Sequence, residues 1–178
     1  MESAHTKNLD RLRVAFPSKE IPSEDAFAQW GATYLDRKPY MEQLRGKSWD
    51  QLDSAYMVRR SDALGFLGTR HLVAVLPVYL RALVEVGPAS PAAGMLTLVL
   101  TKPAVDTEGL GVERFNALVE ALTAEQRAAV AHALRAFSDE HADSSLGQAA
   151  RAALDSQWNT YLPAGASPAF EQQKQEGQ

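Results

Sequence analysis

A segment rich in aromatic and arginine side chains runs from Trp49 to Arg60, with the sequence WDQLDSAYMVRR. Tryptophan, tyrosine and arginine dominate the binding energy of protein interfaces because they combine a large contact area with directed hydrogen bonds. The segment therefore predicts a protein-binding surface made of Trp49, Asp53, Tyr56, Arg59 and Arg60. A second interpretation stays open, since Trp49, Leu52 and Tyr56 share one helical face and would then belong to the core.

The histidines are the candidate metal ligands, because the chain has no cysteine. His132 and His141 are nine residues apart, which puts them on opposite faces of a continuous helix. Neither His5 nor His71 has a histidine or carboxylate partner at a spacing typical of metal sites. The sequence therefore predicts no metal site and no cofactor.

The sequence contains none of the following catalytic motifs. The stretch RGKSW resembles the end of a phosphate-binding loop, but Met41 stands where that loop needs its first glycine. Neither the G-x-S-x-G turn of hydrolases nor the H-E-x-x-H helix of metalloproteases occurs. The sequence thus favours a non-enzymatic protein, while an enzyme with a dispersed active site stays an alternative.

Composition narrows the class of protein further. The chain has 178 residues, of which 46% are hydrophobic, enough for one globular domain with a core. Its formal net charge of -4 argues against nucleic-acid binding, which depends on clustered cations. The run from Leu72 to Leu80 is shorter than the roughly 20 apolar residues of a membrane-spanning helix. We expect no membrane span, no secretory signal at the amino terminus, and a cytoplasmic location.

Short helices should position the Trp49–Arg60 segment. Leu9, Leu12 and Phe16 share a face of a helix over residues 7–16, which Pro17 ends. Ser23 looks like the cap of a second helix, and its apolar face would comprise Phe27, Trp30 and Tyr34. Pro39 suits the first turn of a helix that runs to Leu44. Ser48 and Gln51 have capping-box spacing, which predicts one helix with Trp49, Leu52 and Tyr56 on a single face.

The most apolar stretch, from His71 to Val86, contains Pro77. Thr69 is expected to cap this helix. On a helical wheel Pro77 falls on a narrow polar stripe, together with Arg70, Ala74, Arg81 and Glu85. There water could satisfy the carbonyl that the proline leaves unpaired, while the helix bends around the core. We expect this helix to be the central element of the fold.

The remaining sequence also predicts helices. Residues 95–101 fit a helix or a strand, and the absence of a strand partner favours the helix. Phe115, Leu118, Val119 and Leu122 form one apolar stripe, and Thr123 with Gln126 has capping-box spacing before another helix. A last helix spans about Ser145 to Tyr161. We predict an all-α fold, a single-domain irregular bundle of about seven or eight helices over residues 1–162. Residues 163–178, rich in Pro, Gly, Gln and Glu, are predicted to be a disordered tail.

Four motifs follow one another along the chain, namely SWDQL, DALGFL, LPVYLRAL and LTAEQRAAVAHALRAF. This order resembles an uncharacterised family of small bacterial helical proteins, in which a tryptophan-centred helix precedes a helix with the pattern L-P-x-[YF]-L. The resemblance covers roughly residues 9–137. It implies a helical fold without catalytic residues and, where such genes lie near polymorphic toxins, an immunity function.

The expected function is that of a cytoplasmic, non-enzymatic module that binds another protein, such as an immunity protein that occludes a toxin. Two alternatives remain. One is the enzyme with a dispersed site, and the other is a structural or regulatory homodimer that uses the apolar central helix.

Overall fold

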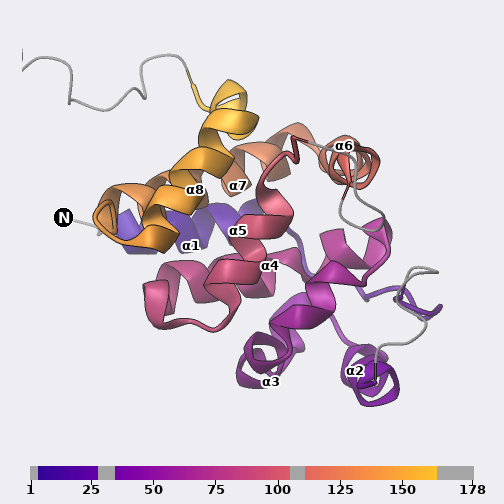
Figure 1. Ribbon diagram of the computed structural model, residues 1–178. Coiled ribbons are helices and arrows are strands. Elements are labelled where there is room, and N and C mark those ends of the chain that lie inside the picture. Colours follow the sequence, from indigo (N-terminus) through magenta and orange to yellow (C-terminus); the bar gives the residue numbers. More distant parts are fainter. Residues whose placement is uncertain (1–3, 28–34, 105–110, 164–178) are drawn as a thin grey trace, which may run out of the picture.

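The computed structural model describes residues 4–27, 35–104 and 111–163, and these form helices joined by short loops (Figure 1). These described residues contain eight α-helices, namely α1 (Ala4–Ala15), α2 (Arg37–Leu44), α3 (Ser54–Arg59), α4 (Thr69–Val86), α5 (Ala92–Leu100), α6 (Val112–Ala121), α7 (Ala124–Glu140) and α8 (Ser145–Ser156). The same part of the chain also contains four 3₁₀ turns, namely η2 (Trp49–Gln51), η3 (Ser61–Gly65), η4 (Gly87–Ala89) and η5 (Trp158–Tyr161).

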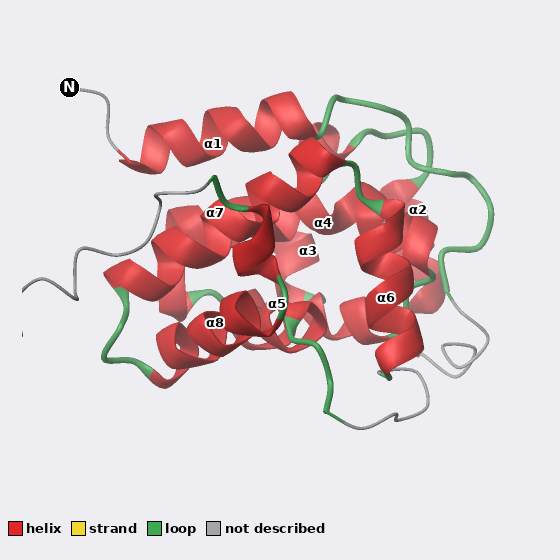
Figure 2. Cartoon of the chain, turned by 90° about the horizontal axis from the view of Figure 1, so that it is seen from above, coloured by secondary structure: helices red, strands yellow, loops and turns green. Residues whose placement is uncertain are grey.

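The helices pack into one bundle, and the described residues contain two isolated β-bridges but no strand. In the view from above, α1 lies along one side of the bundle beside α7, and α6 lies at the far end (Figure 2). The predicted all-α bundle is therefore confirmed. The proposed tail at residues 163–178 lies outside the described residues, apart from Pro163.

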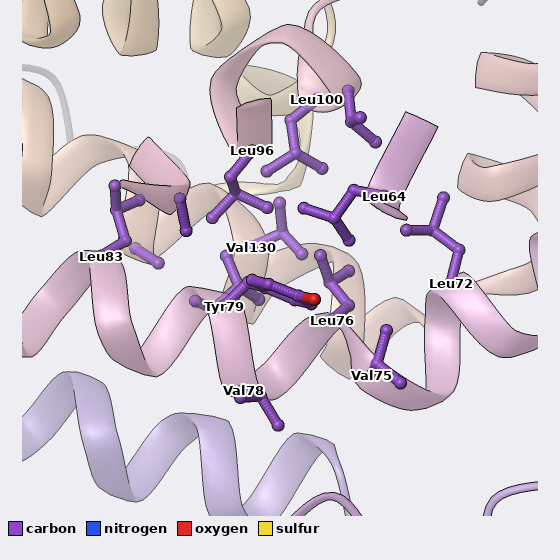
Figure 3. Close-up of a cluster of buried hydrophobic side chains, with 14 of the residues drawn as sticks. Leu64, Leu72, Val75, Leu76, Val78, Tyr79, Leu83, Leu96, Leu100 and Val130 are labelled. Atoms are coloured by element: carbon purple, nitrogen blue, oxygen red, sulfur yellow. The ribbon is translucent and has the colours of Figure 1, made fainter. Parts of the chain in front are cut away.

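Helix α4 is the central element, as predicted, and it contacts α1, α3, α5, α6 and α7. Its side chains Leu76 and Tyr79 meet Leu96, Leu100 and Val130 from other segments (Figure 3). On the opposite side of the helix, Val78 points toward α1. Burial on nearly all sides explains why this segment is the most apolar of the chain.

The prediction that Pro77 faces a polar side is wrong, because Pro77 is buried. Arg70 and Glu85 of the same wheel stripe are exposed, whereas Ala74 and Arg81 are half-buried, so the stripe is exposed only near the two ends of the helix. Between these ends, α3 and η2 pack against α4. There the Arg81 guanidinium lies over the Trp49 ring and donates a hydrogen bond to the Ser54 hydroxyl, which places these segments over the middle of the stripe.

The predicted helix from Ser23 is also wrong in the part that is described. The Asp25 carboxylate accepts a hydrogen bond from the Phe27 amide at 3.1 Å, which is an Asx turn. Phe27 then pairs with Leu67 in an isolated antiparallel bridge, and the Gly68 amide donates to the Ala26 carbonyl at 2.8 Å. Trp30 and Tyr34 lie outside the described residues.

Helix boundaries follow the sequence signals elsewhere, with three differences. Thr123 and Gln126 form the predicted capping box of α7, and residues 95–100 are helical as favoured. The single helix predicted from Ser48 splits into η2 and α3, because Asp53 caps a new helix. Gly68, not Thr69, is the N-cap of α4. The last predicted helix breaks at Gln157, after which η5 begins.

By length and composition alone, residues Thr69–Ala89 could cross a membrane. A core helix of a folded domain meets the same criteria, and 56% of the most apolar window of this segment is buried in the bundle. The absence of a membrane span therefore stays a prediction.

Candidate binding groove

Trp49, the first of the predicted interface residues, is a core residue. Its side chain is 6% exposed, and its indole nitrogen donates a hydrogen bond to the Phe16 carbonyl at 2.7 Å. Of the two interpretations that the sequence left open for Trp49, the structure thus selects core packing. Its hydrogen bond connects η2 to the end of α1.

The other four residues of the predicted surface lie in different environments. The Asp53 carboxylate accepts a hydrogen bond from the Tyr56 amide at 3.1 Å and caps α3. Tyr56 is half-buried against the core. Arg60 pairs with Asp36 at 2.7 Å, whereas Arg59 is exposed and makes no hydrogen bond or ion pair with a described residue. The Trp49–Arg60 segment thus offers one unengaged cation, and its assignment as an interface stays a prediction.

A groove of about 580 Å³ lies between α1 and α7. Along both helices the lining residues recur every three or four positions, so each helix contributes one face. These residues are Lys7, Asp10, Arg11, Val14 and Ala15 from α1, and Glu125, Ala128, Ala129 and His132 from α7. Sequence analysis did not identify this site.

The floor of the groove is apolar because alanine side chains leave space between the two helices. Ala15 and Ala129 are buried there, and Ala128 is half-buried. Val14 stands beside them with 81% of its surface exposed, one of the most exposed large apolar residues of the described chain. When a partner covers an apolar side chain in this position, the free energy of binding becomes more favourable by about 25 cal/mol per Å² of buried apolar surface.

Two cations, Lys7 and Arg11, and two carboxylates, Asp10 and Glu125, line this groove, and they differ in whether they have partners. Lys7 and Arg11 form no ion pair with a described residue; Arg11 donates only to the Asn8 side-chain carbonyl at 3.2 Å. The two carboxylates, by contrast, are engaged. Asp10 pairs with Arg13 at 3.1 Å, and the pKa of Glu125 is lowered by hydrogen bonds from its own amide and from the Thr123 hydroxyl. The two cations of the groove thus have no carboxylate partner among the described residues, whereas both carboxylates already have one ion-pair or hydrogen-bond partner.

His132 lies at the α7 side of the groove and is half-buried. Burial lowers the pKa of His132, and the positive charges of Arg11 and Arg135 lower it further. The neutral form of the ring is thus favoured more than in a free histidine. The local field is positive at this point, which again favours an anion.

His71 and His141 have structural roles. The ring of His71 is buried and bonds to the Pro22 carbonyl at 3.1 Å. His141 is the C-cap of α7, and its ring packs edge-on against Phe137 at 4.9 Å. Among the described residues, no group of three histidines or carboxylates is placed to hold a metal ion.

Comparison with known proteins gave no relative. No protein-family model, curated protein or solved structure matches this chain. The resemblance to small bacterial helical proteins thus holds only at the level of a small all-helical protein.

Proposed function

We propose that this protein is a binding module that accommodates an acidic amphipathic helix of another protein in the α1–α7 groove. A helix fits an apolar groove by inserting side chains spaced three or four residues apart. The observation that supports this proposal is the combination of exposed Val14 on an alanine floor with the unpaired cations Lys7 and Arg11.

The partner's chemistry follows from this combination. Leucine, methionine or phenylalanine side chains would cover Val14 and enter between Ala15 and Ala128. Glutamate or aspartate residues flanking this apolar stripe would pair with Lys7 and Arg11, which gives both orientation and a faster association. A basic helix would be repelled at the same positions.

Selection from a displayed library of amphipathic helical peptides tests the proposal. The library varies the apolar stripe over Leu, Met, Phe and Val, and the flanking positions over Glu, Lys, Gln and Ser. We expect selected peptides to carry glutamate at the flanks. Val14→Glu and the pair Lys7→Glu with Arg11→Glu should each weaken their binding at least about 10-fold, or about 1.4 kcal/mol.

Two control variants test whether a loss of binding is specific to the groove. Val86→Glu places the same change at an exposed valine of α4 outside the groove, and Arg59→Glu changes the unengaged cation of the Trp49–Arg60 segment. Both should leave peptide binding unchanged. The groove is the wrong surface if no peptide is enriched, if only Arg59→Glu reduces binding, or if vesicles with anionic phospholipid bind through Val14 while peptides do not.

A further inference from the structure

A second hollow, a cavity of about 450 Å³, lies between α1, η2 and α4, away from the face of α1 that forms the groove. One part of its wall is apolar and consists of Leu9, Leu12 and the Trp49 ring. The other part is charged and consists of Arg13, Asp50 and Arg81, with the Ser18 hydroxyl beside Asp50. This volume falls within the roughly 300 to 1,000 Å³ typical of small-molecule sites.

Arg81 is fixed in place before any ligand arrives. Its guanidinium carbon lies 6.0 Å from the centre of the Trp49 ring, Nη2 donates to the Ser54 hydroxyl, and Nε lies 3.8 Å from the Glu85 carboxylate. Nη1 makes no hydrogen bond with a described residue and is not sealed from solvent. A guanidinium immobilised on three sides with its remaining donors open is well suited to bind a carboxylate.

Asp50 is held as an anion on the same cavity wall. The Ser18 hydroxyl donates to Oδ2 at 2.7 Å, and the Ser48 hydroxyl donates to Oδ1 at 2.5 Å. These two bonds, from Ser48 first and then Ser18, lower the pKa of the Asp50 carboxyl. Each carboxylate oxygen has a further lone pair and can accept a second hydrogen bond, for example from an ammonium group.

Arg13 adds a second cation to the cavity. Its ion pair with Asp10, at 3.1 Å, joins side chains that are 69% and 51% exposed, so this pair is weak and exchangeable. The cavity thus places two guanidinium groups and one carboxylate around an apolar surface. A molecule that carries a negative charge, a positive charge and an apolar group would satisfy all of them.

We propose that this cavity binds a free α-amino acid with an apolar side chain. The carboxylate of the amino acid pairs with Arg81 and Arg13, its ammonium group donates to Asp50, and its side chain packs against Leu9, Leu12 and the Trp49 ring. This cavity shares no lining residue with the proposed helix-binding groove, although its Arg13 pairs with Asp10 of that groove.

Calorimetric titration of the full chain with L-leucine, L-methionine and L-phenylalanine tests this site. We expect saturable one-to-one binding of at least one of them. For leucine the matched analogues are 4-methylpentanoate, which lacks the amine, and 3-methylbutylamine, which lacks the carboxylate. Each should bind at least about 10-fold more weakly than leucine, because each loses a charge-assisted hydrogen bond.

Substitutions locate the binding. Asp50→Asn and Arg13→Gln change exposed positions and should each reduce affinity at least about 5-fold with the fold intact, as should Arg81→Lys. Arg59→Gln, an exposed arginine outside the cavity, should leave affinity unchanged. The proposal is overturned if none of the amino acids binds, if inorganic phosphate or 4-methylpentanoate binds as tightly as the amino acid, or if Asp50→Asn and Arg13→Gln have no effect.

Discussion

The indole nitrogen of Trp158 donates a hydrogen bond of 2.7 Å to the carbonyl oxygen of Leu100, the last residue of α5. Trp158 is fully buried, and its ring meets Phe115 edge-on with 6.1 Å between the ring centres. Trp49 makes the equivalent bond to Phe16 just beyond α1. Two tryptophans thus each satisfy a carbonyl at the end of a helix that is distant in sequence.

Removal of the Trp158 ring should strongly destabilise the protein. We expect Trp158→Ala to cost about 3–5 kcal/mol in the free energy of unfolding, because it leaves a large cavity. Trp158→Phe should cost about 1–3 kcal/mol, since the Leu100 carbonyl loses its donor. Denaturant unfolding measures both, with the exposed Thr160→Ala as a control within about 0.5 kcal/mol. A Trp158→Phe variant as stable as the parent would show that the hydrogen bond adds no net stability.

Pro77 should be replaceable although it is buried. Alanine restores an amide donor to the helix and removes a penalty of about 3 kcal/mol, while the lost ring leaves a cavity of similar cost. We therefore expect Pro77→Ala to change the free energy of unfolding by no more than about 1 kcal/mol, against about 2–5 kcal/mol for Leu76→Ala. Equal losses in the two variants would mean that the packing of the proline ring dominates.

Arg114 holds α6 against the turn before α4. Its Nη2 donates to the carbonyls of Leu64 at 2.5 Å and Leu67 at 3.2 Å, and burial lowers its pKa. Arg114→Met should cost about 2–3 kcal/mol, because charge-assisted bonds are lost and the carbonyls are left unpaired. Thermal and denaturant melts measure this loss, and Asn116→Ala on the exposed face of α6 is the matched control. A loss no larger than that of the control would contradict the role of this bond.

His132 should make stability depend on pH. Its pKa in the folded protein is lowered below the ordinary 6.5 by burial and by Arg11 and Arg135, so the unfolded chain binds the proton more readily. The free energy of unfolding is therefore not reduced by His132 above about pH 6.5, and it falls as the pH drops below that value because the unfolded chain takes up a proton. The free energy of unfolding, measured from pH 7.5 to 5, should decline less steeply in His132→Gln than in the parent. Parallel curves would show that His132 does not contribute.

The parts of the fold that the sequence predicts are those set by local chemistry. The capping residue Thr123 and the helix-ending Pro17 act on their own neighbours, and their effects can be read without knowledge of the rest of the chain. The break before α3 also had a local signal, because Asp53 is a good N-cap, but the apolar spacing of Leu52 and Tyr56 suggested a continuous helix.

The candidate sites depend on long-range packing, which the sequence does not display. The α1–α7 groove joins residues more than a hundred positions apart, and only the exposed Val14 on the polar side of its helix gave a signal. Likewise, Pro77 shares a helical stripe with charged residues but is buried, and its sequence neighbours do not show that other segments pack around the middle of α4.

The position of Trp158 in the core also affects folding during synthesis. A ribosome makes the chain from its amino terminus, so α4, α5 and α6 emerge before the indole that fills the space between Leu100 and Phe115. Until residue 158 leaves the exit tunnel, the surfaces of Leu100 and Phe115 that Trp158 covers stay open to water and to chaperones. The nascent chain is therefore expected to acquire protease resistance in one late step, rather than helix by helix.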